Sequence, residues 1–327
     1  MGFINKIKFY YKSFLSFIVV SCSSVVGVFA SIILSIVGKK YIAQWATARF
    51  FYYMYRTLLG IDVKVTSPQN LENLPCIFVS NHQSALDIMV IGKCFPRNCT
   101  VTAKKSLKYV PFLGWYMSLS GTLFLDRKNG ASSIVAMKNS LFNVLVQKRA
   151  LWVFPEGTRC SSEQLEMLPF KKGAFHMAQQ GKIPIVPVVV SNTSNLFNKK
   201  HSIFNRGNIV VKVLDPISTQ DLKSEEVADF ANKVQEKMLK ELKELGFCET
   251  SASIKRTDTT TTEAADDPPE TDENEEVEEV STSNTSPEPP VSEGTEATVV
   301  EDKVSQLKSA SENSFSTVGN DDSDDTK

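Results

Sequence analysis

The chain has 327 residues and a formal net charge of -1, a balance that hides two segments of opposite charge. Residues 1–248 carry 31 Lys and Arg against 15 Asp and Glu, whereas residues 249–327 carry 5 against 22. The basic segment favours acidic partners such as lipid headgroups or phosphorylated substrates, and the six scattered cysteines exclude a zinc module or a disulfide framework.

Residues 1–59 predict two membrane-anchoring helices. Residues 14–37 are 24 consecutive residues without a charge. At about 1.5 Å per residue, a helix of that length crosses a hydrocarbon core of about 30 Å. Residues 41–59 mix aromatic side chains with Arg49 and Arg56, a composition typical of the lipid headgroup boundary. For each segment the alternative is a buried core helix.

Residues 60–248 are predicted to form one α/β domain in which strands alternate with helices. Short apolar runs predict strands at 76–80, 100–103, 122–125, 151–154, 185–190 and 209–214. Apolar residues at helical spacing predict helices at 131–148 and 221–245. The alternation indicates a mostly parallel central sheet flanked by helices on both faces.

Residues 249–327 predict a disordered acidic tail. Runs of threonine and glutamate offer almost no apolar surface to bury, so the segment cannot offset the entropy cost of ordering. Its many serines leave two alternatives open, a phosphoregulated tail and an inert one.

His82 stands out because Asp87 follows it by five positions, directly after the strand predicted at 76–80. Within one continuous helix these side chains would not share a face. If the helix begins near Ser84, Asp87 lies in its first turn and reaches back to one imidazole nitrogen, which leaves the other as a general base. The alternative is a capping box, in which Ser84 and Asp87 serve only to start the helix. The remaining histidines are expected to be structural or exposed: His176 and His201.

A second polar loop, residues 154–159, follows the strand predicted at 151–154. Gly157 allows backbone N–H groups to approach an anion, and Arg159 is suited to bidentate phosphate binding. The alternative is an ordinary tight turn with a surface arginine. Because the carboxyl ends of parallel strands share one edge of the sheet, both loops are expected to meet there.

More positive charge follows two other predicted strands. Lys104 and Lys105 come after the strand at 100–103, and Arg127 follows the strand at 122–125. For Arg127 the alternative is a simple salt bridge with Asp126.

Taken in order, these segments resemble the four sequence blocks of the glycerolipid acyltransferases, and more narrowly those of the fungal 1-acyl-sn-glycerol-3-phosphate acyltransferases. The blocks here are residues 81–87, 121–127, 154–159 and 183–187, supported by residues 103–111. The resemblance covers about residues 1–246 and leaves out the acidic tail. One departure is Cys160, which stands where a serine often follows the arginine.

The resemblance implies a membrane-bound enzyme that transfers a fatty acyl group from acyl-CoA to the sn-2 hydroxyl of lysophosphatidic acid and forms phosphatidic acid. It implies that His82 is the base and Asp87 its partner, and that Pro187 helps to shape the acyl-donor site. It further implies a set of residues that bind the acceptor's glycerol phosphate: Arg127, Glu156, Gly157, Thr158 and Arg159. Two lysines at the same predicted sheet edge are added to this set because of their positive charge: Lys104 and Lys105.

A G-x-S-x-G elbow and a metal-ligand set are absent from the sequence, so we expect neither a serine acyl-enzyme nor a bound metal or other cofactor. Acyl-CoA is expected as a co-substrate in a direct transfer, because a thioester is already activated. The expected partners are lysophosphatidic acid, acyl-CoA and membrane lipids, and nucleic acid is not expected.

The expected location is the endoplasmic reticulum membrane with the active site facing the cytosol, and the lipid droplet is a second location. Two alternatives to this function remain. One is an acyltransferase for glycerol-3-phosphate or another lysophospholipid, and the other is a non-catalytic lipid-binding scaffold. The intact pair of His82 and Asp87 argues against the scaffold, because binding alone needs no base.

Overall fold

The structure of the protein is a computed structural model that describes residues 3–126, 136–137, 141 and 144–251. Most of the predicted acidic tail and part of the helix predicted at 131–148 lie outside the described residues. Arg127 lies outside them as well.

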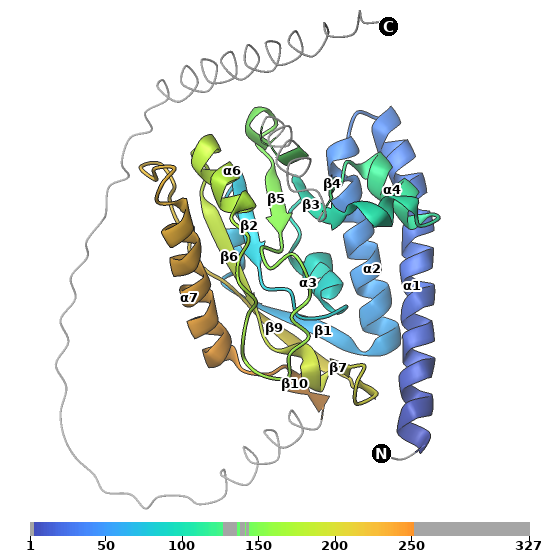
Figure 1. Ribbon diagram of the computed structural model, residues 1–327. Helices are drawn as coiled ribbons and strands as arrows, with labels where there is room; N and C mark the ends of the chain where they lie inside the picture. The colour runs from blue at the N-terminus through green and yellow to red at the C-terminus, as the bar shows by residue number, and fades with distance from the viewer. Residues whose placement is uncertain (1–2, 127–135, 138–140, 142–143, 252–327) are drawn as a thin grey trace, which may run out of the picture. The chain divides into compact units, whose positions relative to one another are not determined.

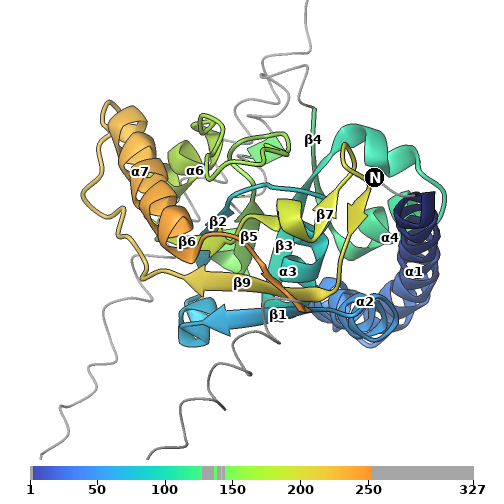
Figure 2. The same ribbon diagram turned by 90° about the horizontal axis from the view of Figure 1, so that it is seen from below.

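The described residues form a three-layer α/β fold around a central sheet (Figures 1 and 2). Among them, eight strands form this sheet, in the order β1–β9–β6–β2–β5–β3–β4 with β10 beside β9. The strands are β1 (Ile61–Thr66), β2 (Cys76–Ser80), β3 (Cys99–Lys104), β4 (Leu123–Leu125), β5 (Ala150–Val153), β6 (Ile185–Val190), β9 (Gly207–Val213) and β10 (Glu249–Thr250). A separate hairpin consists of β7 (Phe197–Asn198) and β8 (Ile203–Phe204).

The predicted mostly parallel sheet is confirmed. Strands β2 to β6 run parallel to one another, and β1 runs parallel to β9. The antiparallel pairs are β6 with β9 and β9 with β10. All six predicted strands are present, whereas β1, β10 and the β7–β8 hairpin were not predicted. Strand β10 also continues the described chain into the segment that was predicted to be a disordered tail.

The described helices of eight residues or more lie around this sheet. They are α1 (Phe3–Ile36), α2 (Ala43–Leu59), α3 (Asp87–Cys94), α4 (Leu113–Ser120), α6 (Gly173–Gly181) and α7 (Val227–Leu245). Short 3₁₀ turns are η1 (Lys40–Ile42), η2 (Pro68–Glu72), η3 (Lys105–Tyr109) and η4 (Thr193–Asn195). Helices α2 and α3 pack on one face, and α6 and α7 pack on the other (Figure 1).

The central strands are continuously apolar because both of their faces are buried. Phe78, Trp152 and Val186 point into the core on the α2–α3 side. Their chain neighbours Ile77 and Leu151 point into the core on the α6–α7 side, as the alternation of side chains along a strand requires.

Helix α1 carries the apolar segment predicted as a membrane helix. Among the described helices it alone is long and apolar enough to cross a membrane, a criterion that a core helix or a signal sequence would also meet. Only 28% of its apolar stretch is buried, unlike a core helix. At its N-terminal end Lys12 Nζ donates to the carbonyl of Phe204 at 2.7 Å. Its outer face exposes large side chains: Phe14, Phe17, Phe29 and Ile33.

Helix α2, the second predicted anchor, is largely a core element. Phe51, Tyr55 and Leu59 are buried against the sheet. The buried amide of Gln44 donates to Thr100 Oγ1 at 3.2 Å and accepts from the backbone N–H of Val101 at 3.2 Å, which ties α2 to β3. The alternative of a core helix therefore describes the inner face of α2.

Helix α7 supplies a test of the α6–α7 side of the core. Met238 is fully buried on the apolar face of this helix, and Lys240 is exposed two positions later. Met238→Ala is expected to lower the free energy of unfolding by about 2–5 kcal/mol because it leaves a cavity. Lys240→Ala is expected to change it by less than about 0.5 kcal/mol. Urea unfolding followed by tryptophan fluorescence measures both values, and equal effects would contradict the described packing.

Candidate active site

Three loops meet at the carboxyl edge of the parallel strands. Strands β2, β5 and β6 end at this edge and lead into residues 81–86, 154–161 and 191–195. The first two loops are bonded through their backbones, since Cys160 N–H donates to the His82 carbonyl at 2.8 Å and Ser161 N–H donates to the Gln83 carbonyl at 3.1 Å. The predicted meeting of the loops at one sheet edge is confirmed.

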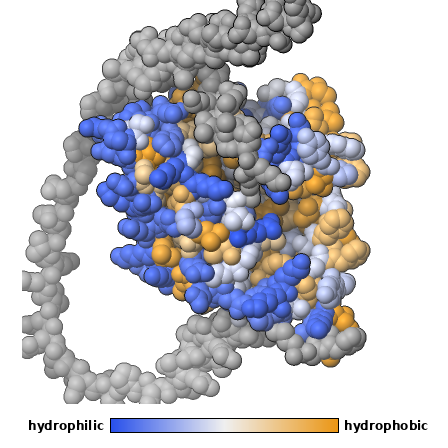
Figure 3. Space-filling view, in the orientation of Figure 1, coloured by the Kyte–Doolittle hydropathy of each residue, from blue (hydrophilic) through white to orange (hydrophobic). Residues whose placement is uncertain are grey.

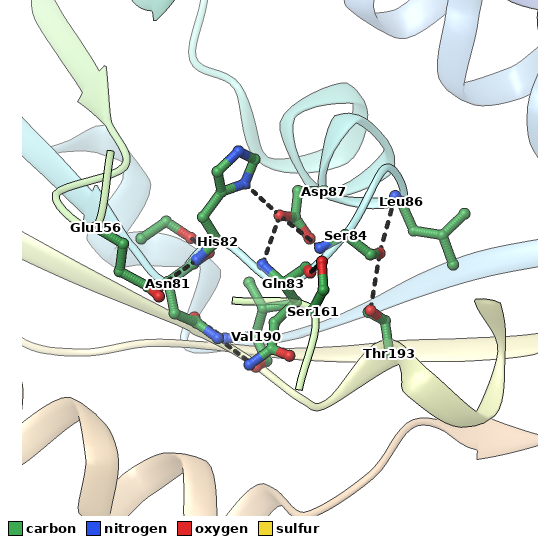
Figure 4. Close-up of polar contacts among 11 residues, drawn as sticks. Asn81, His82, Gln83, Ser84, Leu86, Asp87, Glu156, Ser161, Val190 and Thr193 are labelled. Carbon is green, nitrogen blue, oxygen red and sulfur yellow. Dashed lines mark hydrogen bonds and ion pairs between the residues drawn. The ribbon is translucent and has the colours of Figure 1, made fainter. Parts of the chain in front are cut away.

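His82 and Asp87 form the central pair of this edge. The His82 Nδ1 and Asp87 Oδ2 atoms are 2.6 Å apart, and Figure 4 shows the other ring nitrogen pointing away from the carboxylate. The side chain of Asp87 is 3% exposed and that of His82 is 14% exposed. One imidazole nitrogen, Nδ1, therefore contacts the Asp87 carboxylate, and the other, Nε2, points away from it.

Asp87 is also the first residue of helix α3. The Asp87 Oδ2 atom accepts from the backbone N–H groups of Gln83 at 2.8 Å and Ser84 at 3.2 Å. The alternative capping box is not formed, because Leu86 occupies the N-cap position and the helix has no side-chain cap. The Oδ2 atom instead accepts both backbone donors and faces the imidazole. The Asp87 Oδ1 atom is buried without a hydrogen-bond partner among the described residues.

Glu156 lies behind His82 rather than in a cavity. Its Oε1 atom accepts from the backbone N–H of His82 at 2.7 Å, and its Oε2 atom accepts from that of Leu168 at 2.9 Å. Burial raises the pKa of Glu156, and these two N–H donors oppose that rise. Both oxygens are occupied by backbone groups, so Glu156 fixes the position of the His82 backbone.

Two further side chains shape this edge, although the sequence analysis assigned them no role. The ring of Phe154 stacks on the His82 ring with centroids 4.3 Å apart. The Asn81 amide joins the loop to β6, since it donates to the Val190 carbonyl at 2.9 Å and accepts from the Val190 N–H at 2.8 Å. A polar residue directly after a fully buried strand was the sequence signal for Asn81.

An apolar cavity of about 470 Å³ begins at His82. It extends between α1, α2 and α4, and its apolar lining includes Val20, Phe51, Ile91, Leu113 and Met117. Its polar lining near the pair includes residues of the two loops, of α3 and of β3: Ser84, Asp87, Lys104, Thr158 and Arg159.

A second pocket of about 680 Å³ adjoins the first, and Ser84, Ala85 and Arg159 line both. Its other walls come from residues 161–163, from 193–194 and from the β7–β8 hairpin. We call it the hairpin pocket. Ser84 Oγ accepts from Thr193 Oγ1 at 2.8 Å across its wall.

The remaining predicted site residues are dispersed. Gly157 has a φ of +71°, a conformation that favours glycine, so the loop turns there as predicted. Lys105 pairs with Asp126 at 3.3 Å instead of lining either cavity. Pro187 lies within β6 and lines neither cavity, because side-chain alternation along β6 places it on the α6–α7 side of the sheet with Ile185.

Among the described residues, no group of three His, Cys, Asp or Glu side chains is arranged to hold a metal ion. Positive charge at the site comes instead from lysine and arginine side chains. Arg159 is exposed at the shared wall of the two cavities, where an anion has access to it.

Comparisons with known proteins identify relatives of this chain. A family model described as Acyltransferase matches residues 62–191. The 1-acyl-sn-glycerol-3-phosphate acyltransferase of Saccharomyces cerevisiae is 53% identical over 247 residues, which cover 76% of this chain and 82% of the relative. The human 1-acyl-sn-glycerol-3-phosphate acyltransferase beta is 33% identical over 63% of this chain and 74% of its own length.

A solved structure shares the fold. The crystal structure of the 1-acyl-sn-glycerophosphate acyltransferase PlsC from Thermotoga maritima matches with a TM-score of 0.58 and 24% sequence identity, over 73% of this chain and 97% of that one. The residues matched by the family model include the loops that carry His82 and Arg159. The chain therefore belongs to the acyltransferase family that includes these 1-acyl-sn-glycerol-3-phosphate acyltransferases.

Proposed function

We propose that this protein transfers a fatty acyl group from acyl-CoA to the sn-2 hydroxyl of lysophosphatidic acid and releases phosphatidic acid and CoA. The observation that carries this proposal is the His82–Asp87 pair at the junction of an apolar cavity and a cationic wall. The family supports the reaction, since relatives that cover most of this chain are named for that acceptor.

In this mechanism His82 is the general base. With its Nδ1 proton held by Asp87, the Nε2 atom accepts the proton of the acceptor hydroxyl as that oxygen attacks the thioester carbon. The C–S bond of the tetrahedral intermediate then breaks, and the leaving sulfur takes the proton from His82. A base of this kind typically contributes about 10²–10⁴-fold to the rate.

Asp87 supports the base electrostatically. Its carboxylate is buried, and Oδ1 lacks a hydrogen-bond partner among the described residues. A buried, incompletely paired carboxylate is costly, and a positive charge beside it offsets that cost. The imidazolium that forms during proton transfer is therefore stabilised at this position.

Arg159 is assigned to the phosphate of the acceptor. That phosphate is on the glycerol carbon next to the one that carries the reacting hydroxyl, so it must bind close to His82. Arg159 lies in the loop that is hydrogen-bonded to the His82 carbonyl, and its guanidinium fork matches phosphate oxygens. Thr158 and Lys104 line the same part of the cavity and are assigned supporting contacts.

The apolar cavity is assigned to an acyl chain, and its walls point to the membrane. Helices α1 and α4 form its outer side and expose apolar side chains on their other surface, including Phe29 and Trp115. Figure 3 shows apolar residues gathered on the α1–α4 side and hydrophilic residues over α7. We assign the protein to the endoplasmic reticulum membrane with the site facing the cytosol, the compartment that supplies acyl-CoA.

The acceptor is tested by assaying the purified full chain in phospholipid nanodiscs with oleoyl-CoA. Lysophosphatidic acid is compared with glycerol-3-phosphate and lysophosphatidylcholine. The proposal expects phosphatidic acid as the product and at least a tenfold higher kcat/KM for lysophosphatidic acid, since each of the other acceptors lacks either its acyl chain or its free phosphate. Preference for another acceptor would refute it.

His82→Ala is expected to lower kcat by about 10²–10⁴-fold, because the hydroxyl loses its proton acceptor. Asp87→Asn is expected to lower kcat by at least roughly 10²-fold, because the imidazolium loses its negative partner. Steady-state assays measure both effects, and thermal unfolding checks that the variants fold. The matched control is His176→Ala on α6, which should retain full activity. A His82→Ala protein with more than a tenth of the native kcat would contradict the assignment.

Arg159→Ala is expected to raise the KM for lysophosphatidic acid about tenfold or more, because it removes a charge-assisted contact to phosphate. Arg159→Lys should restore part of the affinity, since lysine keeps the charge and lacks the planar fork. The KM for 1-acylglycerol, which lacks the phosphate, should not change. An equal rise for both acceptors would show that Arg159 does not act on the phosphate.

A further inference from the structure

Two lysine side chains of the hairpin pocket have no role in the reaction as described so far. Lys199 and Lys200 lie in the turn between β7 and β8, line this pocket, and are exposed. Neither ammonium group forms a hydrogen bond or an ion pair within 4.0 Å with a described residue, although Lys200 is close enough to Glu163 to help lower the pKa of that carboxyl group. With Arg159 on the shared wall, the lining carries three cationic side chains.

One carboxylate, Glu163, lines the pocket with three cationic side chains, and its direct partners are His201 and Asn198. Glu163 Oε1 is 2.9 Å from His201 Nε2 and accepts from Asn198 Nδ2 at 3.0 Å. The Asn198 hydrogen bond is the largest cause that lowers the pKa of Glu163, and nearby positive charge adds to it. Glu163 therefore holds the loop of residues 161–163 against the hairpin turn, and the pocket favours a ligand with more than one negative charge.

The hairpin is also fixed in place. The Phe197 and Phe204 rings contact each other with centroids 5.2 Å apart, and Phe9 of α1 stacks on Phe197 at 5.9 Å. Lys12 donates to the Phe204 carbonyl. The two lysines are thus held on a braced element, which lowers the entropy cost of binding a charged ligand there.

We propose that Lys199 and Lys200 bind the phosphates of the CoA half of the acyl donor, an inference that rests on the proposed function. CoA carries a pyrophosphate and a 3′-phosphate, and the pantetheine arm separates them from the thioester. The donor phosphates therefore bind away from His82 when the thioester is beside it. The acceptor phosphate has no such spacer and needs a cation close to the base, which Arg159 supplies.

The two adjoining cavities match the two halves of the donor. The apolar cavity, which begins at His82, takes the acyl chain, and the polar hairpin pocket takes the phosphorylated half. Ser84, Ala85 and Arg159 line both cavities. In this arrangement the thioester of the donor lies beside these residues. Lysine suits this role because it binds phosphate as a compact point charge that follows a flexible ligand.

The test compares the full-length native protein with the double variant Lys199→Ala/Lys200→Ala. Calorimetry measures the affinity for CoA and 3′-dephospho-CoA, and steady-state kinetics give the KM for oleoyl-CoA and for oleoyl-pantetheine, which lacks all three phosphates. We expect the double variant to bind CoA about tenfold more weakly and to have a KM for oleoyl-CoA about tenfold higher. The loss should be smaller for 3′-dephospho-CoA, and the KM values for oleoyl-pantetheine and lysophosphatidic acid should not change.

Two matched variants accompany this test. Lys233→Ala/Lys237→Ala removes the same charge from the exposed face of α7 and should leave every value unchanged. Lys199→Arg/Lys200→Arg should restore CoA affinity because it keeps both charges.

Three results would overturn the inference: CoA affinity that does not depend on the lysines, an equal loss for oleoyl-CoA and oleoyl-pantetheine, or a higher KM for lysophosphatidic acid alone. The second would indicate contact with the membrane surface, and the third would place the acceptor phosphate in the pocket. A native protein that binds CoA through these lysines but does not acylate lysophosphatidic acid would refute the proposed function and leave this inference standing.

Discussion

The carboxylate of Asp87 organises the site because one of its oxygens, Oδ2, meets three nitrogen atoms. Two are backbone N–H groups of the preceding loop, and the third is His82 Nδ1. A buried carboxylate is costly without such donors, and its place at the start of α3 adds the favourable end of the helix dipole. The chain must therefore wrap residues 82–84 around the first turn of the helix, and this wrapping fixes the direction of the imidazole.

Around this interaction the parallel sheet acts as a frame. Strands β2, β5 and β6 end at one edge, so loops far apart in the chain become neighbours. Backbone hydrogen bonds join the first two loops, and Glu156 holds the His82 N–H from behind. His82 follows β2, which lies between β5 and β6, so the loops after both neighbouring strands support the base. Proton transfer requires such a fixed geometry.

The protein has an apolar surface on one side and a cationic pocket elsewhere, an arrangement that suits a reaction between a lipid and a water-soluble thioester. The α1–α4 side carries exposed apolar side chains (Figure 3). The hairpin pocket is lined by exposed cationic side chains. In the proposed reaction the acyl chain and the phosphates of the donor take opposite directions from His82. The residues between them, Ser84, Ala85 and Arg159, belong to both cavities.

Most strands of the parallel sheet, the apolar first helix and the pairing of His82 with Asp87 were predictable from local sequence patterns. Continuous apolar runs mark strands that are buried on both faces, and the five-residue separation lets a helix start place the carboxylate beside the ring. Strand β1 was missed because Asp62 and Lys64 interrupt its apolar pattern, and the hairpin strands were missed because each has two residues.

Tertiary structure alone decided what each loop residue faces. Glu156 and Arg159 are three positions apart in one loop, yet the first is buried behind His82 and the second is exposed at the cavity wall. Pro187 was expected at the donor site, but the pleat of β6 turns it to the other face of the sheet. Lys199 and Lys200 reach the site only through the packing of the hairpin against α1. Local patterns report which residues are buried or start a helix, whereas the direction of a side chain at a strand end depends on neighbours that are distant in the chain.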